Sequence, residues 1–206
     1  MTEPNCNPSA ARLSTIRAFA ALDLDGASVE VAVRTAERLR TARGAPGASW
    51  TPAEKMHVTV KFASELPVDT AEPLGAALAP LAAAFAAAPA YPLRLEAFPT
   101  ARHARVVVLE LADASGVLQG LAASIDELFA TYRVPKEDRP FRPHLTLARL
   151  KRPFDARRWL GAQSAELASS EPGRVTSARV TALTLYRSKL GANGSSYVAL
   201  ARHTFA

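Results

Sequence analysis

Two short motifs, one in each half of the chain, carry residues that can transfer protons and hold a phosphate. The first reads HVTV from His57 to Val60, and the second reads HLTL from His144 to Leu147. Each motif is a histidine, an apolar residue, a threonine and a second apolar residue. A single copy is ordinarily the exposed face of a strand, but a repeat within one chain predicts a shared function.

Opening a cyclic phosphodiester is a reaction that two opposed histidines suit. Attack on phosphorus runs in line with the leaving oxygen, so a base is needed on one side and an acid on the other. Histidine has an ordinary pKa of about 6.5, so one ring can accept a proton near neutral pH while the other donates one. His57 and His144 are therefore the candidate catalytic pair, and the sequence does not say which is the base. The hydroxyls of Thr59 and Thr146 are candidates to bind the non-bridging phosphate oxygens.

Both motifs lie in segments that alternate as β-strands do. Residues two apart in a strand share a face, so His57 and Thr59 point to one side and the valines between and after them point to the core. His144 and Thr146 repeat the arrangement. If the two halves are pseudo-symmetric lobes, each with a sheet backed by helices, their polar faces meet across a central cleft.

Two basic residues near the motifs are candidates to neutralise a phosphate. Lys61 has the same parity as His57 and Thr59, so a regular strand places it on their face. Arg149 has the opposite parity to His144 and reaches that face only through a twist or a β-bulge. Both are equally well described as ordinary surface charges.

Hydrophobic periodicity predicts the elements that must position these residues. Strands are expected at 16–24, 56–63, 91–98, 105–111, 144–150, 174–187 and 196–203, and helices at 28–43, 69–88, 115–132 and 154–160. Helices separate some of the strands and tight turns separate others, which indicates an α+β fold rather than a doubly wound parallel sheet. A charged, Pro-rich loop, 134–143, leads directly into His144.

Composition limits the class of protein. The 206 residues, 49% of them hydrophobic, predict one domain over 16–206, preceded by a disordered leader over 1–15. No apolar run is long enough to span a bilayer, and a single cysteine, Cys6, fits a reducing cytoplasm. The net charge of +6 attracts polyanions or simply aids solubility. There is no HExxH motif or Cys and His cluster, so no metal or cofactor is expected, and His103 and His203 are expected to be incidental.

Several further segments extend the pattern of the two motifs into a resemblance to a known family. These landmarks are RAFAAL at 17–22, Trp50, Pro52 and Glu54 ahead of HVTVKF, AFP at 97–99, RPFRPHLTLAR at 139–149 and LYRSKLG at 185–191. With them the chain resembles the two-histidine phosphoesterase superfamily, and within it the RNA 2',3'-cyclic phosphodiesterases once described as 2'-5' RNA ligases. The resemblance covers nearly the whole chain after residue 15.

The resemblance implies a fold and a chemistry. It implies two pseudo-symmetric lobes around a cleft, both histidines as catalytic residues, both threonines on the phosphate, and Arg149 as a phosphate ligand without a metal. The implied reaction is hydrolysis of RNA 2',3'-cyclic phosphate ends to 2'-phosphomonoesters. RNA ends and small cyclic nucleotides both stay open as substrates, and a monomer is the default expectation. Two alternatives stay open: 2'-5' RNA ligation as a reverse activity, and a module that binds nucleotides or RNA ends without turnover.

Three positions depart from the family pattern and bear on the substrate. Ser49 stands where a basic residue is usual, Ser64 where glycine is usual, and Val108 where an aromatic residue is common. Without an aromatic side chain at 108, Phe19 and Tyr186, together with Phe141, are the candidates to stack on a base. Each of these rings is equally well explained as core packing.

Overall fold

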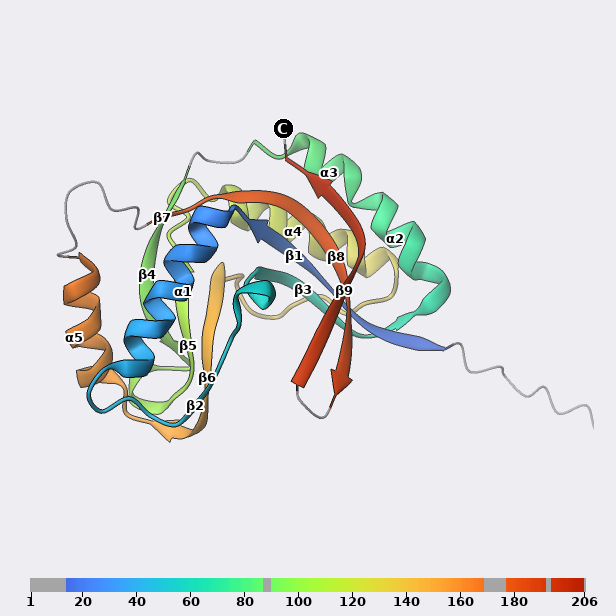
Figure 1. The fold of residues 1–206 in the computed structure, drawn as a ribbon. Helices are drawn as coiled ribbons and strands as arrows, with labels where there is room; N and C mark the ends of the chain where they lie inside the picture. The colour runs from blue at the N-terminus through green and yellow to red at the C-terminus, as the bar shows by residue number, and fades with distance from the viewer. Residues whose placement is uncertain (1–13, 87–89, 169–176, 192–193, 206) are drawn as a thin grey trace, which may run out of the picture.

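The computed structural model describes residues 14–86, 90–168, 177–191 and 194–205 (Figure 1). The strands are β1 (Thr15–Leu24), β2 (Ala48–Trp50), β3 (Val58–Pro67), β4 (Tyr91–Phe98), β5 (Ala104–Leu111), β6 (His144–Phe154), β7 (Ser177–Ala178), β8 (Val180–Gly191) and β9 (Gly194–Thr204). The α-helices are α1 (Gly26–Thr41), α2 (Ala71–Ala77), α3 (Ala79–Ala84), α4 (Val117–Thr131) and α5 (Arg157–Ala168). Three short 3-10 turns are η1 (Ala53–Lys55), η2 (Val68–Thr70) and η3 (Ala101–His103).

The described strands form one antiparallel sheet. Its order is β7-β4-β5-β6-β3-β1-β8-β9. The short strand β2 lies off this path and pairs with residues 148–150 of β6. The two strands that follow the histidines, β3 and β6, are neighbours in the middle of this order (Figure 1). The expected α+β class, an antiparallel sheet backed by helices, is confirmed. The two lobes stay a prediction, because strands from both halves of the chain join in a single sheet instead of forming one sheet each.

The helices form where an apolar stripe and a cap coincide. The Asp25 carboxylate accepts a hydrogen bond of 2.8 Å from the Ser28 backbone N–H and so caps α1, which buries Ala32, Ala36 and Leu39. In α4 the residues at helical spacing are buried, as the sequence predicts: Leu118, Leu121, Ile125 and Phe129. Burial of these stripes against the sheet supplies most of the stability of the two helices.

The helices cover different parts of the sheet. In Figure 1, α1 lies over the end of the sheet that holds β4, β5 and β6, and α2 and α3 follow the far end at β8 and β9. Helix α4 packs on β3. The contact between α2 and β9 is close, because a Cβ atom added at Gly75 would lie 2.8 Å from the Cβ of Ala201. The imidazole of His203 hydrogen-bonds the Gly75 carbonyl at 2.8 Å, which gives this histidine a role in packing.

Several predicted boundaries differ from the structure. The helix expected at 154–160 begins only at Arg157, as α5. The strand expected at 144–150 continues through its charged end to Phe154, which is the last residue of β6. The single helix expected over 69–88 is two short helices that break just before Pro80, whose ring cannot continue a helix unbroken. The short strand β2 was not predicted. The expected leader and Cys6 lie outside the described residues, apart from Ser14 and Thr15. No described helix is long and apolar enough to cross a membrane.

Candidate active site

The two histidine and threonine pairs of the motifs share one face in the middle of the sheet. Val58 of β3 pairs with Leu145 of β6, and both side chains are fully buried on the opposite face. Because the strands are antiparallel, the histidine of each motif lies on the side of this pair that holds the threonine of the other. The four residues that share the face are His57, Thr59, His144 and Thr146.

A β-bulge in β6 brings Arg149 onto the same face. On β5, Val108 pairs with Thr146 and Val106 pairs with Arg149, although these partners are two residues apart on β5 and three apart on β6. The extra residue is Leu147, which is buried. Because directly paired residues share a face, Arg149 and Thr146 project on the same side. The bulge that the parity of Arg149 required is therefore present, and its side chain is exposed.

A second bulge removes Lys61 from the site. Ala21 of β1 pairs with Thr59, and Ala20 pairs with Lys61, so β3 holds one extra residue, Val60, between these two positions. The bulge reverses the parity, and Lys61 points to the face opposite Thr59, where it is 2% exposed. The expectation that Lys61 shares the face of His57 and Thr59 is wrong, because it assumed a regular strand.

The imidazole of His57 is partly buried and held by two polar contacts. Its Nε2 lies 3.1 Å from the Thr59 hydroxyl oxygen, and the ring hydrogen-bonds the Lys55 backbone. Burial lowers the pKa of His57 to about 4. The negative charge of the Asp23 carboxylate acts in the opposite direction and raises this pKa. The charge of His144 also lowers the pKa of His57, so the two rings are close enough to influence each other electrostatically.

The imidazole of His144 has a defined orientation. Its Nδ1 lies 2.7 Å from the carbonyl oxygen of Arg142, which can only accept, so Nδ1 carries a hydrogen and Nε2 is the open nitrogen of the neutral ring. Burial lowers the pKa of His144, and the positive charges of Arg142 and Arg149 lower it further. The hydrogen bond to the Arg142 backbone and the carboxylate of Glu110 act in the opposite direction. In both motifs the ring thus bonds the backbone two residues upstream.

An aromatic cluster surrounds His57. Phe19 stacks on the imidazole with ring centres 4.9 Å apart, and Tyr186 stacks on Phe19 at 5.3 Å. Tyr197 meets His57 edge to face at 5.4 Å. Phe19 is only 3% exposed, so it packs the histidine and offers no free face to a base. Tyr186 is partly exposed and stays a candidate for stacking, and the structure adds Tyr197, which was not predicted and is also partly exposed.

Asp23 ties this cluster to the neighbouring strands. Its carboxylate accepts hydrogen bonds from the hydroxyls of Thr184 and Tyr186, both at 2.8 Å, and from Nε of Arg202 at 3.0 Å. Burial raises the pKa of Tyr186 to about 12, helped by the bond to Asp23, so the phenol stays protonated. Sequence reasoning missed Asp23, because its proximity to His57 arises from the pairing of β1 with β3.

Phe98 is the corresponding neighbour of His144. Its ring meets the imidazole edge to face at 4.9 Å, and the guanidinium of Arg142 lies 4.5 Å above the ring of Phe98. Arg142 also donates to Glu110 at 2.8 Å. The AFP segment singled out in the sequence contains Phe98, but only the structure shows that the ring touches a histidine.

The remaining candidates lie at the margin of the site. Val108 is fully buried, so this position offers no stacking surface. Phe141 lines a cavity of about 310 Å³ beside the site, together with Glu110 and Arg142, and neither histidine lines that cavity. Exposed His103 lies in η3. Within the described ranges no group of three or more His, Cys, Asp or Glu side chains is placed to hold a metal ion.

Comparisons with known proteins bear on the family and the fold. An RNA 2',3'-cyclic phosphodiesterase of Thermus thermophilus is 36% identical over 121 residues, which span 52% of this chain and 58% of the relative. The crystal structure of Escherichia coli LigT complexed with 3'-AMP covers 94% of this chain and 99% of its own, with 23% identity and a TM-score of 0.68. A crystal structure of a Thermus thermophilus protein covers 92% of this chain and 98% of its own, with 26% identity and a TM-score of 0.65.

The family follows from a match that spans most of the chain. The model of the 2'-5' RNA ligase superfamily matches residues 28–192, which include both histidine motifs and Arg149. The solved structures share the fold over nearly their whole length. This chain belongs to the 2'-5' RNA ligase superfamily.

Proposed function

We propose that the chain hydrolyses RNA 2',3'-cyclic phosphate ends to 2'-phosphomonoesters without a metal. The observation that carries the proposal is the pairing of Val58 in β3 with Leu145 in β6, which supports a site in which the two histidines and two threonines lie side by side on the opposite face of the sheet. The relative from Thermus thermophilus that is named for this activity supports the substrate class. Small nucleotides are a second substrate class, because LigT has been crystallised with 3'-AMP, NADP+ and ATP.

The proposed step is an in-line displacement at phosphorus. Water attacks opposite the ribose O3', one histidine takes the proton of the water, and the other gives a proton to O3' as the P–O3' bond breaks. The new P–O bond and the remaining P–O2' bond leave the phosphate on the 2' oxygen. Thr59 and Thr146 donate hydrogen bonds to the non-bridging oxygens, and the guanidinium of Arg149 offsets the charge that builds there.

We assign the base to His57 and the acid to His144. The pKa of His57 is lowered to about 4, so this ring is neutral and able to accept a proton at any pH near neutrality. Burial lowers the pKa of His144 as well, but its Nδ1–H bond to the Arg142 carbonyl and the nearby Glu110 carboxylate both favour the protonated ring. Its open Nε2 is the atom that carries a proton to the leaving oxygen.

The pH dependence of kcat/KM follows from these two shifts. The active form holds a neutral His57 and a protonated His144, so activity appears as pH rises through about 4 and disappears above the pKa of His144, which lies below 6.5. We expect an optimum of kcat/KM on the acid side of pH 6.5. Above the pKa of His144, on the alkaline limb of the profile, kcat/KM should fall about tenfold for each pH unit. The profile of kcat should lie at higher pH, because the bound phosphate anion favours the protonated histidine. A kcat/KM that keeps rising up to about pH 8 would contradict the assignment.

Chelation tests the proposed absence of a metal. The protein, treated with EDTA and freed of it, should cleave an oligonucleotide with a 2',3'-cyclic phosphate end at the same rate with and without added Mg²⁺ or Mn²⁺. An oligonucleotide of the same sequence with a linear 3'-phosphate is the matched control and should stay unchanged. Activity that is lost with EDTA and restored by one of these ions would contradict the proposal.

A further inference from the structure

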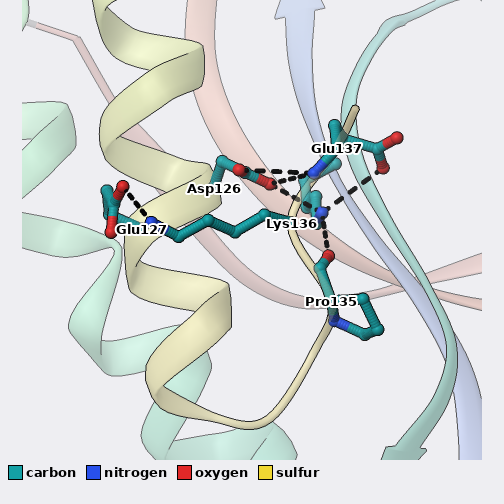
Figure 2. Close-up of polar contacts among 6 residues, drawn as sticks. Asp126, Glu127, Pro135, Lys136 and Glu137 are labelled. Atoms are coloured by element: carbon teal, nitrogen blue, oxygen red, sulfur yellow. Dashed lines mark hydrogen bonds and ion pairs between the residues drawn. The ribbon is translucent and has the colours of Figure 1, made fainter. Parts of the chain in front are cut away.

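A buried ion cluster joins the strand after His57 to the loop that leads into His144. Nζ of Lys61 lies 2.6 Å from Oδ1 of Asp126 in α4 and 3.3 Å from Oε1 of Glu137 in the loop, and it donates to the carbonyl of Pro135. Figure 2 shows Asp126, Pro135 and Glu137 converging on one ammonium group. The Lys61 side chain is 1% exposed and that of Asp126 is 20% exposed, so this ion pair is largely removed from solvent, whereas the Glu137 side chain reaches the surface at 56% exposure.

The loop is fixed at both of its ends. At its start, the Asp126 carboxylate accepts a hydrogen bond from the Glu137 backbone N–H at 3.2 Å, in addition to the ion pair with Lys61. At its far end, the Gln119 side chain donates to the Phe141 carbonyl, and the Leu111 backbone N–H donates to the Pro143 carbonyl at 2.8 Å. The backbone between these points includes the Arg142 carbonyl, which orients the ring of His144.

The link matters because β3 and β6 hold each other weakly. Over the described residues these strands share one paired position, Val58 with Leu145, whereas β1 pairs with β3 along most of its length. The relative placement of the two histidines therefore depends on contacts outside the ladder. The Lys61 ammonium group is itself buried, so water and salt screen its attraction to these partners less than they screen an exposed ion pair.

We propose that Lys61 is a positioning residue that ties the His57 strand to the His144 loop and so sets the spacing and orientation of the two rings. The inference rests on the proposed function for its kinetic consequence only. Lys61 does not touch the substrate face, because the bulge at Val60 turns it to the opposite side. Its effect is exerted through the loop and the Arg142 carbonyl.

The chain offers a matched control for this lysine. Lys136 of the same loop pairs with Glu127 of the same helix, and both side chains are more than half exposed (Figure 2). Lys136→Met removes one exposed lysine and one ion pair between loop and helix, whereas Lys61→Met removes a buried lysine and the ion pairs that join β3 to the helix and to the loop. Exposed pairs of this kind contribute little, so the control should behave as the wild type.

The test measures the His144 ring and the kinetics in both variants. We expect Lys61→Met to lower kcat about tenfold or more with little change in KM, because small displacements of catalytic groups cost this much. By ¹⁵N NMR without substrate, the pKa of His144 should shift and its Nδ1–H tautomer should lose population, whereas Lys136→Met leaves both unchanged. Lys61→Arg, which keeps the charge, should recover part of kcat.

A double variant and the NMR comparison cover the cases in which Lys61→Met does not fold or the wild type is inactive. If Lys61→Met does not fold, the double variant Lys61→Met/Asp126→Asn replaces it, since it removes the unpaired charge but keeps an oxygen that can accept from the Glu137 N–H, and the Glu137 side chain already reaches solvent. A folded Lys61 variant whose His144 pKa, tautomer and kcat equal those of Lys136→Met would overturn the proposal. If the wild type does not cleave cyclic phosphates, the proposed function fails, and the NMR comparison alone decides the role of Lys61.

Discussion

Alanine at either position 57 or position 144 is expected to lower kcat/KM for an RNA 2',3'-cyclic phosphate by about 10²- to 10⁴-fold, because each change removes one proton-transfer group. The double variant should be little worse than the poorer of the two single variants, since the base and the acid act in one step. Steady-state kinetics at the pH optimum of the wild type provide the comparison. Unfolding temperatures of all variants separate loss of chemistry from loss of fold.

His103→Ala is the control for these variants. This histidine is exposed in η3, so its removal should leave kcat/KM unchanged. His203 is not a suitable control, because its ring bonds the Gly75 carbonyl and supports the packing of α2 on β9. Full activity in a folded His57→Ala or His144→Ala protein would exclude that residue from the reaction.

Loss of the Arg149 guanidinium should lower kcat/KM by about 100-fold, because a cation beside the phosphate stabilises charge that develops only in the transition state. Arg149→Met tests this expectation, and most of the effect should appear in kcat. Arg149→Lys should recover only part of the loss, because an ammonium group keeps the charge but not the planar pair of donors.

Arg152→Met provides the matched control for Arg149. Arg152 lies in the same strand, is also exposed, and carries the same charge, but lies further along β6 from His144 and, among the described strands, has no pairing that sets it on the face of Thr146. If Arg152→Met lowers kcat/KM as much as Arg149→Met does, the effect is one of net charge on an anionic substrate. The bulge would then have no catalytic purpose.

The sequence predicts the elements and the motif residues well, but strand parity alone misplaces the residues after them. The two motifs are local patterns, so a period of two identifies His57, Thr59, His144 and Thr146 correctly as sharing faces. Each strand then contains one extra residue, at Val60 and at Leu147. A bulge depends on pairing with a distant strand, which is why no local pattern reveals it.

Long-range pairing also decides which residues surround the histidines. Phe98, Tyr197 and Asp23 come from three strands that are far from the motifs in sequence. Only the register of the sheet brings the two rings into contact with a histidine and the Asp23 carboxylate close enough to raise the pKa of His57. The sequence likewise did not predict that both halves of the chain join in one sheet. A spacing can suggest that two strands resemble each other, but it does not say that they are neighbours.

The most direct test of the paired-histidine hydrolase follows one oligonucleotide with a 2',3'-cyclic phosphate end by ³¹P NMR, in the presence of the wild type and of the double histidine-to-alanine variant. With the wild type, the resonance of the cyclic phosphate should be replaced by that of a 2'-phosphomonoester, and with the double variant it should persist. A cyclic phosphate that stays intact while bound to the wild type would contradict the account and favour a module that binds RNA ends without turnover.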